Sequence, residues 1–238
     1  SSAASDVYKR QLLALAFAAS PLVTSSFGGF DPNAFPVPQD DPPVVPAGYA
    51  FSIWGLIYLA LIAHGLIGLR RGDDPDWAPT RAPLAVSLAV GAVWIPVANS
   101  SPVWATVLIL IMLAGALVAL LRAGPSDPWT LSTPIGLYAG WLTAASAVSL
   151  GLLLAGYGIT SDLTAALVAL TVALAIGLGI LNARPSWGYV APLTWAFTGV
   201  GIRNWDDAWI LTALALIAAV GVILAGVVMT KARRVSGA

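Results

Sequence analysis

The sequence of 238 residues has no cysteine, no glutamate, a single histidine and few charges of either sign. Without cysteine there is neither a disulfide framework nor a thiolate, and one histidine cannot complete a metal site built from protein ligands. A formal net charge of zero excludes the basic surface typical of nucleic-acid partners. Paired acidic residues and His/Asp clusters are also missing, which disfavours a membrane-embedded hydrolase or transferase. We therefore assign no catalytic residue and no metal ligand.

Apolar residues dominate what is present. They make up 58% of the chain, and the mean hydropathy is +0.86. Apolar runs long enough to cross a bilayer cover residues 11–27, 46–69, 82–99, 102–122, 130–155, 161–182, 187–202 and 207–230. The sequence thus predicts an all-α, polytopic integral membrane helix bundle with about eight transmembrane helices. The seventh run is short and contains Pro192, so a hairpin or re-entrant segment is an alternative there.

Basic residues predict the orientation, because Lys and Arg stay on the cytoplasmic side of bacterial membranes. With the N-terminus inside, ten of the eleven Lys and Arg residues fall on the cytoplasmic side, and Arg203 is the exception. This favours a multi-pass protein of the bacterial inner (cytoplasmic) membrane with both termini cytoplasmic. Residues 1–10 are expected to be disordered, and residues 231–238 to form a basic cytoplasmic tail. The first run also resembles a signal peptide, but we favour an uncleaved helix.

Residues 28–45 form the longest external loop and contain five prolines and no basic residue. Proline restricts such a loop to extended and turn conformations. It is either a solvated connector or a lid over a pocket.

Three ionisable residues near or within the spans each have two interpretations. Arg203 either pairs with the neighbouring Asp206 and Asp207 or meets an anionic ligand at the mouth of a pocket. His64 is either a buried helix residue or an axial haem ligand. Asp162 is either the N-cap of the sixth helix or part of an ion path.

The ten tryptophans fall into two sets. Tryptophan near a helix end is typical of the interfacial belt of a membrane protein, and this set comprises Trp77, Trp104, Trp129, Trp187, Trp205 and Trp209. The others lie more than one turn inside a helix and need another explanation; they are Trp54, Trp94, Trp141 and Trp195. At 1.5 Å per residue, three of these four lie about 8 to 12 Å from the outer end of their helices, and Trp141 lies about 21 Å deep.

Helical spacing places some of these rings beside small residues. On the second helix Phe51, Trp54 and Tyr58 share one stripe, and the fifth helix presents four residues on one face: Tyr138, Trp141, Ala145 and Ser149. Large rings beside small residues can leave a slot for a flat ligand. Close helix packing is the alternative, because small residues commonly mark helix contacts in membranes.

The same residues resemble the translocator protein family, also called the tryptophan-rich sensory or TspO/MBR family. The second helix matches its proline, tryptophan and tyrosine spacing at Pro46, Trp54 and Tyr58, although Phe51 stands one residue closer to the tryptophan than in the family. The third helix carries an element similar to Trp-Ser-Pro at Trp94-Ile95-Pro96. The fifth helix matches at Tyr138, Trp141 and Ala145, with Ser149 in place of asparagine.

The resemblance covers residues 11–155 and implies a five-helix core, followed by additional C-terminal transmembrane helices in residues 156–230. It implies an apolar cavity below the first loop that binds a porphyrin or a sterol-like molecule. The implied ligand-binding residues are Tyr49, Phe51, Trp54, Tyr58, Trp94, Pro96, Tyr138, Trp141, Ala145 and Ser149. No cofactor is required, and porphyrin or haem would be bound as a ligand.

We therefore expect a membrane receptor or binding protein for a hydrophobic ligand, acting in sensing, transport or tetrapyrrole homeostasis. The expected partners are this small molecule and membrane lipid, and a homodimer is left open. Light-dependent porphyrin breakdown is a further activity that the resemblance implies. The alternative is a small-solute secondary transporter with a broken seventh helix, which Pro192 suggests.

Overall fold

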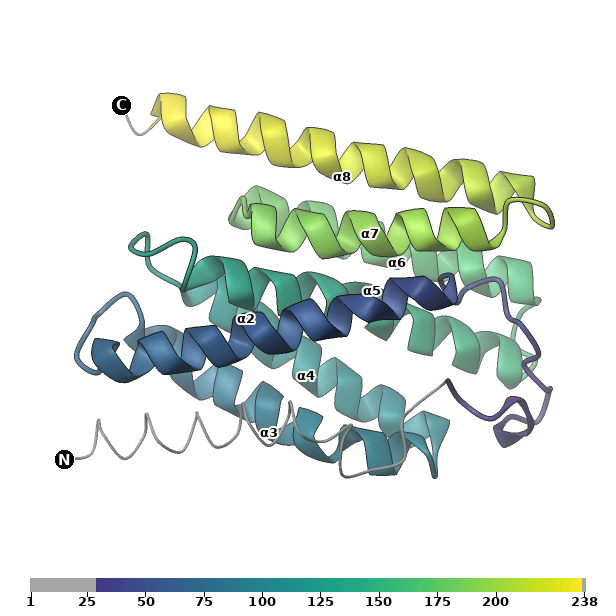
Figure 1. The fold of residues 1–238 in the computed structure, drawn as a ribbon. Helices are drawn as coiled ribbons and strands as arrows, with labels where there is room; N and C mark the ends of the chain where they lie inside the picture. Colours follow the sequence, from purple (N-terminus) through teal and green to yellow (C-terminus); the bar gives the residue numbers. More distant parts are fainter. Residues whose placement is uncertain (1–28, 237–238) are drawn as a thin grey trace. The chain divides into compact units, whose positions relative to one another are not determined.

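Seven α-helices account for most of residues 29–236, which are the residues that the computed structural model describes (Figure 1). They are α2 (Ile53–Gly68), α3 (Arg81–Ala98), α4 (Pro102–Arg122), α5 (Ser132–Gly156), α6 (Asp162–Ala183), α7 (Trp187–Arg203) and α8 (Trp209–Ser236). Short 3-10 helices are η1 (Pro32–Ala34), η2 (Gly48–Ser52), η3 (Leu69–Arg71) and η4 (Ala78–Thr80). The described residues contain no strand, so the predicted all-helical polytopic fold is confirmed. The helix expected at 11–27 and the disordered segment 1–10 lie outside the described residues.

Local sequence explains where several helices begin. The Ser101 side chain accepts a hydrogen bond from Trp104 N (3.3 Å), and Pro102 occupies the first position of α4, where its missing N–H costs nothing. The Ser161 side chain likewise accepts from Thr164 N at 3.3 Å. Ser161 is therefore the N-cap of α6, and the prediction of Asp162 at this position was wrong by one residue.

Among residues 29–236, six helical stretches are long and apolar enough to cross a membrane: Gly48–Arg71, Ala78–Ala98, Pro102–Arg122, Ser132–Gly156, Asp162–Ala183 and Trp209–Arg233. The chain is thus a multi-pass membrane protein. At 17 residues, α7 is near the lower limit for a spanning helix. It continues through Pro192 without a break, so the structure does not show the discontinuity that motivated the transporter alternative.

The chain divides into two compact units. The described part of unit 1 comprises residues 29–30 and 53–139, which hold α2, α3, α4 and the start of α5. That of unit 2 comprises residues 31–52 and 140–236, which hold η2, the rest of α5, and α6 to α8. The boundary falls inside α5, so residues of this one helix contribute to the packing of both units.

Small residues bring helices close together within each unit. In unit 1, α3 packs along α4, and a Cβ added at Gly115 would lie 2.7 Å from Pro83 O. In unit 2, α6 contacts α7 and α8, and its buried face is formed largely by alanines. Such close approach is the usual mode of helix association in membranes, where burial of apolar surface gives little gain over lipid.

Candidate ligand-binding site

The residues expected to line the pocket are divided equally between the two units. Unit 1 contains Trp54, Tyr58, Trp94, Pro96 and Tyr138, and unit 2 contains Tyr49, Phe51, Trp141, Ala145 and Ser149. Each half therefore has to be judged by the contacts inside its own unit.

In unit 2, four rings gather around η2. Tyr49 meets Trp195 of α7 edge to face, with ring centroids 5.4 Å apart, and Phe51 meets Trp141 of α5 in the same way at 5.8 Å. Between them, Trp195 Nε1 donates a hydrogen bond to Ala50 O at 3.0 Å. The short helix η2 is thus held by a tryptophan of α5 and a tryptophan of α7. We call Tyr49, Phe51, Trp141 and Trp195 the aromatic group.

Three members of the aromatic group remain substantially accessible. The side chains of Tyr49, Phe51 and Trp195 are 45%, 40% and 39% exposed, whereas Trp141 is buried. Exposed apolar rings that already contact one another offer a ready surface for a further flat ring. Trp195 was not among the predicted site residues, because the family resemblance ended before α7. Its calculated depth, similar to that of Trp54 and Trp94, was the sequence feature that could have included it.

The two small residues predicted beside Trp141 differ in their surroundings. Ser149 is buried, and Ala145 is only partly covered. Elsewhere on α5 a small residue serves packing: a Cβ at Gly140 would lie 2.5 Å from Tyr189 O of α7. Close packing therefore accounts for Gly140, and a slot beside Ala145 and Ser149 stays a prediction.

In unit 1, most of the predicted ligand-binding residues stack on a neighbouring ring or hydrogen-bond to a neighbouring helix. Trp54 stacks on Tyr58 at 5.4 Å with an interplanar angle of 21°, as expected one turn apart. Trp94 Nε1 donates to Ala105 O at 2.9 Å and so ties α3 to α4. Tyr138 is fully buried, and its hydroxyl lies 3.0 Å from Ser87 Oγ. Pro96 is exposed. These contacts favour packing for Trp94 and Tyr138.

The proline-rich segment, residues 31–52, is packed against the helices of unit 2. Phe35, Val44 and Ala50 are buried in it, and Val37 N donates to Gly156 O at 2.8 Å. The loop is therefore docked on unit 2 at these points and exposed between them, for example at Pro36 and Pro38. The lid alternative stays a prediction.

Arg203 lies at the end of α7 and forms an ion pair with Asp41 of the proline-rich segment, at 2.6 Å between Arg203 Nη2 and Asp41 Oδ1. Among the described residues, it forms no ion pair with Asp206 or Asp207. The sequence suggested Asp206 and Asp207 as partners of Arg203, whereas its partner in the structure is Asp41.

A family model described as TSPO-like protein matches residues 38–229. The chain belongs to this family. Membership of this family suggests a membrane ligand-binding or sensory protein. The matched range includes α6, α7 and most of α8, and the division of the chain at residue 155 stays a prediction. No curated protein and no solved structure matched the chain.

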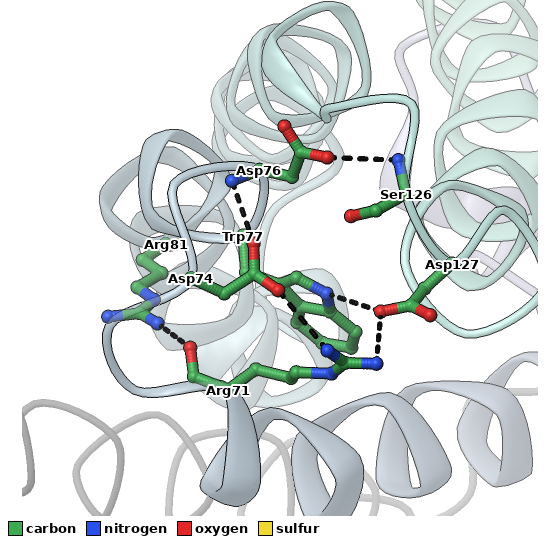
Figure 2. Close-up of polar contacts among 7 residues, drawn as sticks. All are labelled: Arg71, Asp74, Asp76, Trp77, Arg81, Ser126 and Asp127. Atoms are coloured by element: carbon green, nitrogen blue, oxygen red, sulfur yellow. Dashed lines mark hydrogen bonds and ion pairs between the residues drawn. The ribbon is translucent and has the colours of Figure 1, made fainter.

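This TSPO-like protein has a polar cluster in unit 1, where the α2–α3 and α4–α5 connections meet (Figure 2). Arg71 Nη2 pairs with Asp127 Oδ2 at 2.7 Å, and Trp77 Nε1 donates to the same oxygen at 3.2 Å. Ser126 N donates to Asp76 Oδ2 at 3.0 Å, as Figure 2 also shows. Each connection thus supplies one carboxylate that accepts from the other connection, and these contacts join the two.

Trp77 and His64 belong to the interior of this cluster. Trp77 is only 2% exposed, so its assignment to the interfacial belt was wrong, whereas the other five belt tryptophans are exposed. His64 stacks on Trp77 at 4.8 Å, and its Nδ1 lies 2.8 Å from Thr130 O, which can only accept. These contacts support the buried-residue interpretation of His64. Among residues 29–236, no group of three or more His, Cys, Asp or Glu side chains could hold a metal ion.

Proposed function

We propose that this TSPO-like protein binds a flat hydrophobic molecule, a porphyrin rather than a sterol-like molecule, on the aromatic group of unit 2. The observation that carries the proposal is the contact of Tyr49 with Trp195 while both rings remain exposed, with Phe51 exposed two residues away. A porphyrin offers a large planar π-system that can stack on such rings. A sterol has no π-system and would gain only from apolar contact.

The same proposal includes the location, role and assembly of the protein. The protein acts in the bacterial inner membrane with both termini cytoplasmic, where its ligand partitions into lipid. Binding serves sensing, transport or tetrapyrrole homeostasis, and no cofactor is needed for it. Two copies can pair as a homodimer, but the aromatic group does not require a second copy, since all four of its rings come from one chain.

Quenching of tryptophan fluorescence tests the proposal. The purified protein in detergent is titrated with protoporphyrin, and the Tyr49→Ala/Phe51→Ala double variant is compared with the original chain. This variant keeps all ten tryptophans, so every reporter residue is still present, and quenching is measured relative to the variant's own ligand-free emission. Each aromatic contact contributes about 0.5–1.5 kcal/mol beyond its apolar area, so we expect the affinity to fall about tenfold.

Tyr157→Ala is the matched control, because Tyr157 is exposed to a similar degree in the same unit but lies outside the aromatic group. Its affinity should equal that of the original chain. Unchanged binding in the double variant would overturn the proposed site. If Trp54→Ala/Tyr58→Ala instead abolished binding, the site would lie in unit 1.

A further inference from the structure

Arg203 is placed to receive a carboxylate. It is the single basic residue that the orientation puts on the outer side, and it occupies the last turn of α7. Its present partner is a carboxylate, and the guanidinium can bind such a group through two parallel N–H donors. The side chain is about one-third exposed, so it is accessible.

The partner of Arg203 is weakly held. The Asp41 side chain is 90% exposed, and its backbone has a φ of 50°, in the left-handed region that non-glycine residues seldom adopt. Within the described part of the chain, the ion pair with Arg203 is the side-chain interaction found for Asp41. An ion pair that faces solvent contributes little stability, so another carboxylate can replace Asp41 at small cost.

A continuous set of contacts leads from Arg203 to the aromatic group. The proline-rich segment runs along α7: Asn204 Nδ2 donates to Pro43 O (2.9 Å), Ala47 N donates to Gly199 O (3.0 Å), and Trp195 donates to Ala50 O. A Cβ at Gly199 would lie 3.0 Å from Pro46 Cβ, so the segment closely covers this part of α7. Arg203 and Trp195 are about 12 Å apart along the helix axis.

We propose that Arg203 binds a carboxylate of the porphyrin, which takes the place of Asp41 and releases the outer end of the proline-rich segment from α7. The inference rests on the proposed function, because the ring must be held on the aromatic group. Protoporphyrin carries its two carboxylates on flexible chains at one edge of the ring. With this edge toward the C-terminal end of α7, the carboxylates reach Arg203. Asp41 thereby competes with the ligand's carboxylate for Arg203.

Comparing protoporphyrin with its dimethyl ester tests the exchange, because the ester keeps the ring and lacks the charge. Arg203→Gln should lower the affinity for the free acid about tenfold, the loss expected for one charge-assisted hydrogen bond. Asp41→Asn should raise that affinity about two- to fivefold, because the competitor is removed. Neither variant should change the affinity for the ester.

Two control variants match these changes in charge. Asp40→Asn alters the adjacent exposed aspartate, and Arg122→Gln alters an exposed arginine at the end of α4. Both should bind the free acid as the original chain does. Suppose that Arg203→Gln and Asp41→Asn change the affinity for neither the free acid nor the ester, or change both affinities equally. The proposed replacement of Asp41 by the ligand's carboxylate is then wrong, while the proposed function stands. If the original chain binds neither form, both proposals fail.

Hydrogen exchange supplies an independent readout of release. The Ala47 amide, bonded to Gly199 O, should exchange faster when the free acid saturates the protein than when the ester does. Equal exchange with the two ligands would overturn the release of the segment, even if Arg203 binds the carboxylate.

Discussion

Asp41 in unit 2 and Asp127 in unit 1 share a sequence context and a backbone conformation, but their surroundings differ. Each precedes a proline, has a φ near 50°, and pairs with an arginine from a remote part of its unit. Asp127 is 27% exposed, and it also accepts from Trp77 Nε1 and, through its carbonyl, from Leu131 N at 2.8 Å. Asp41 is 90% exposed and depends on Arg203.

The comparison shows that the environment of an ion pair decides its role. A left-handed non-glycine residue costs about 1–2 kcal/mol, and this cost has to be offset by other contacts. Several contacts, partly shielded from solvent, offset it at Asp127, so that pair is structural. A single exposed contact offsets it at Asp41, so that pair can exchange partners. Four substitutions test this difference, beginning with the largest expected effect.

Replacing Trp77 by alanine should have the largest effect. The ring is buried, stacks on His64 and donates to Asp127, so truncation should cost about 3–5 kcal/mol of stability. Thermal unfolding of the purified protein in detergent measures the loss. Trp129→Ala, which removes an exposed tryptophan from the same unit, should change the melting temperature little. Equal melting of the two variants would show that the unit 1 cluster is not structural.

Replacing Asp127 by alanine should be the next most damaging change. It removes the partner of Arg71, leaves Trp77 Nε1 without this acceptor and keeps the backbone strain. The expected cost is about 2–4 kcal/mol in the same thermal assay. Asp127→Gly removes the strain but not the loss of contacts, so it should recover only part of the stability. Full recovery in the glycine variant would mean that strain, not the contacts, decides the effect.

Asn204→Ala tests what holds the proline-rich segment to α7. Asn204 is buried, and its Nδ2 donates to Pro43 O and Val200 O. Its loss should cost about 1–2 kcal/mol and speed hydrogen exchange at the amides of Val44, Val45 and Ala47. If hydrogen exchange at these amides is unchanged, contacts other than those of Asn204 hold the proline-rich segment to α7. Asn33→Ala, an exposed asparagine in the same segment, is the control.

Asp41→Gly should have the smallest effect on stability. Glycine adopts the left-handed conformation freely, and the lost ion pair faces solvent, so the two effects nearly cancel within about 0.5 kcal/mol. The melting temperature should therefore stay close to that of the original chain. A loss similar to that of Asp127→Gly would remove the distinction between the two aspartates.

The positions of the helices could be predicted because their causes are local. An apolar run ends at a charge, a proline or a serine cap, whichever partner the helix later meets, and the predicted run 102–122 coincides with α4. The resemblance of Trp54, Trp94 and Trp141 to the family motif is likewise a matter of spacing along one chain, and the match over residues 38–229 confirms the family. Three of the four members of the aromatic group could be named in this way, namely Tyr49, Phe51 and Trp141, but Trp195 could not.

The sequence by itself determined that this protein is helical, multi-pass and a member of its family, since apolar run length, capping and residue spacing act over one or two helical turns. Only the tertiary structure decided which side chains meet. Trp77 is buried because two connections close over it, and Arg203 chooses Asp41 over its neighbours because the proline-rich segment returns along α7. Partners that are remote in sequence depend on how helices pack, and small residues such as Gly199 set that packing without revealing which segment will fill the space.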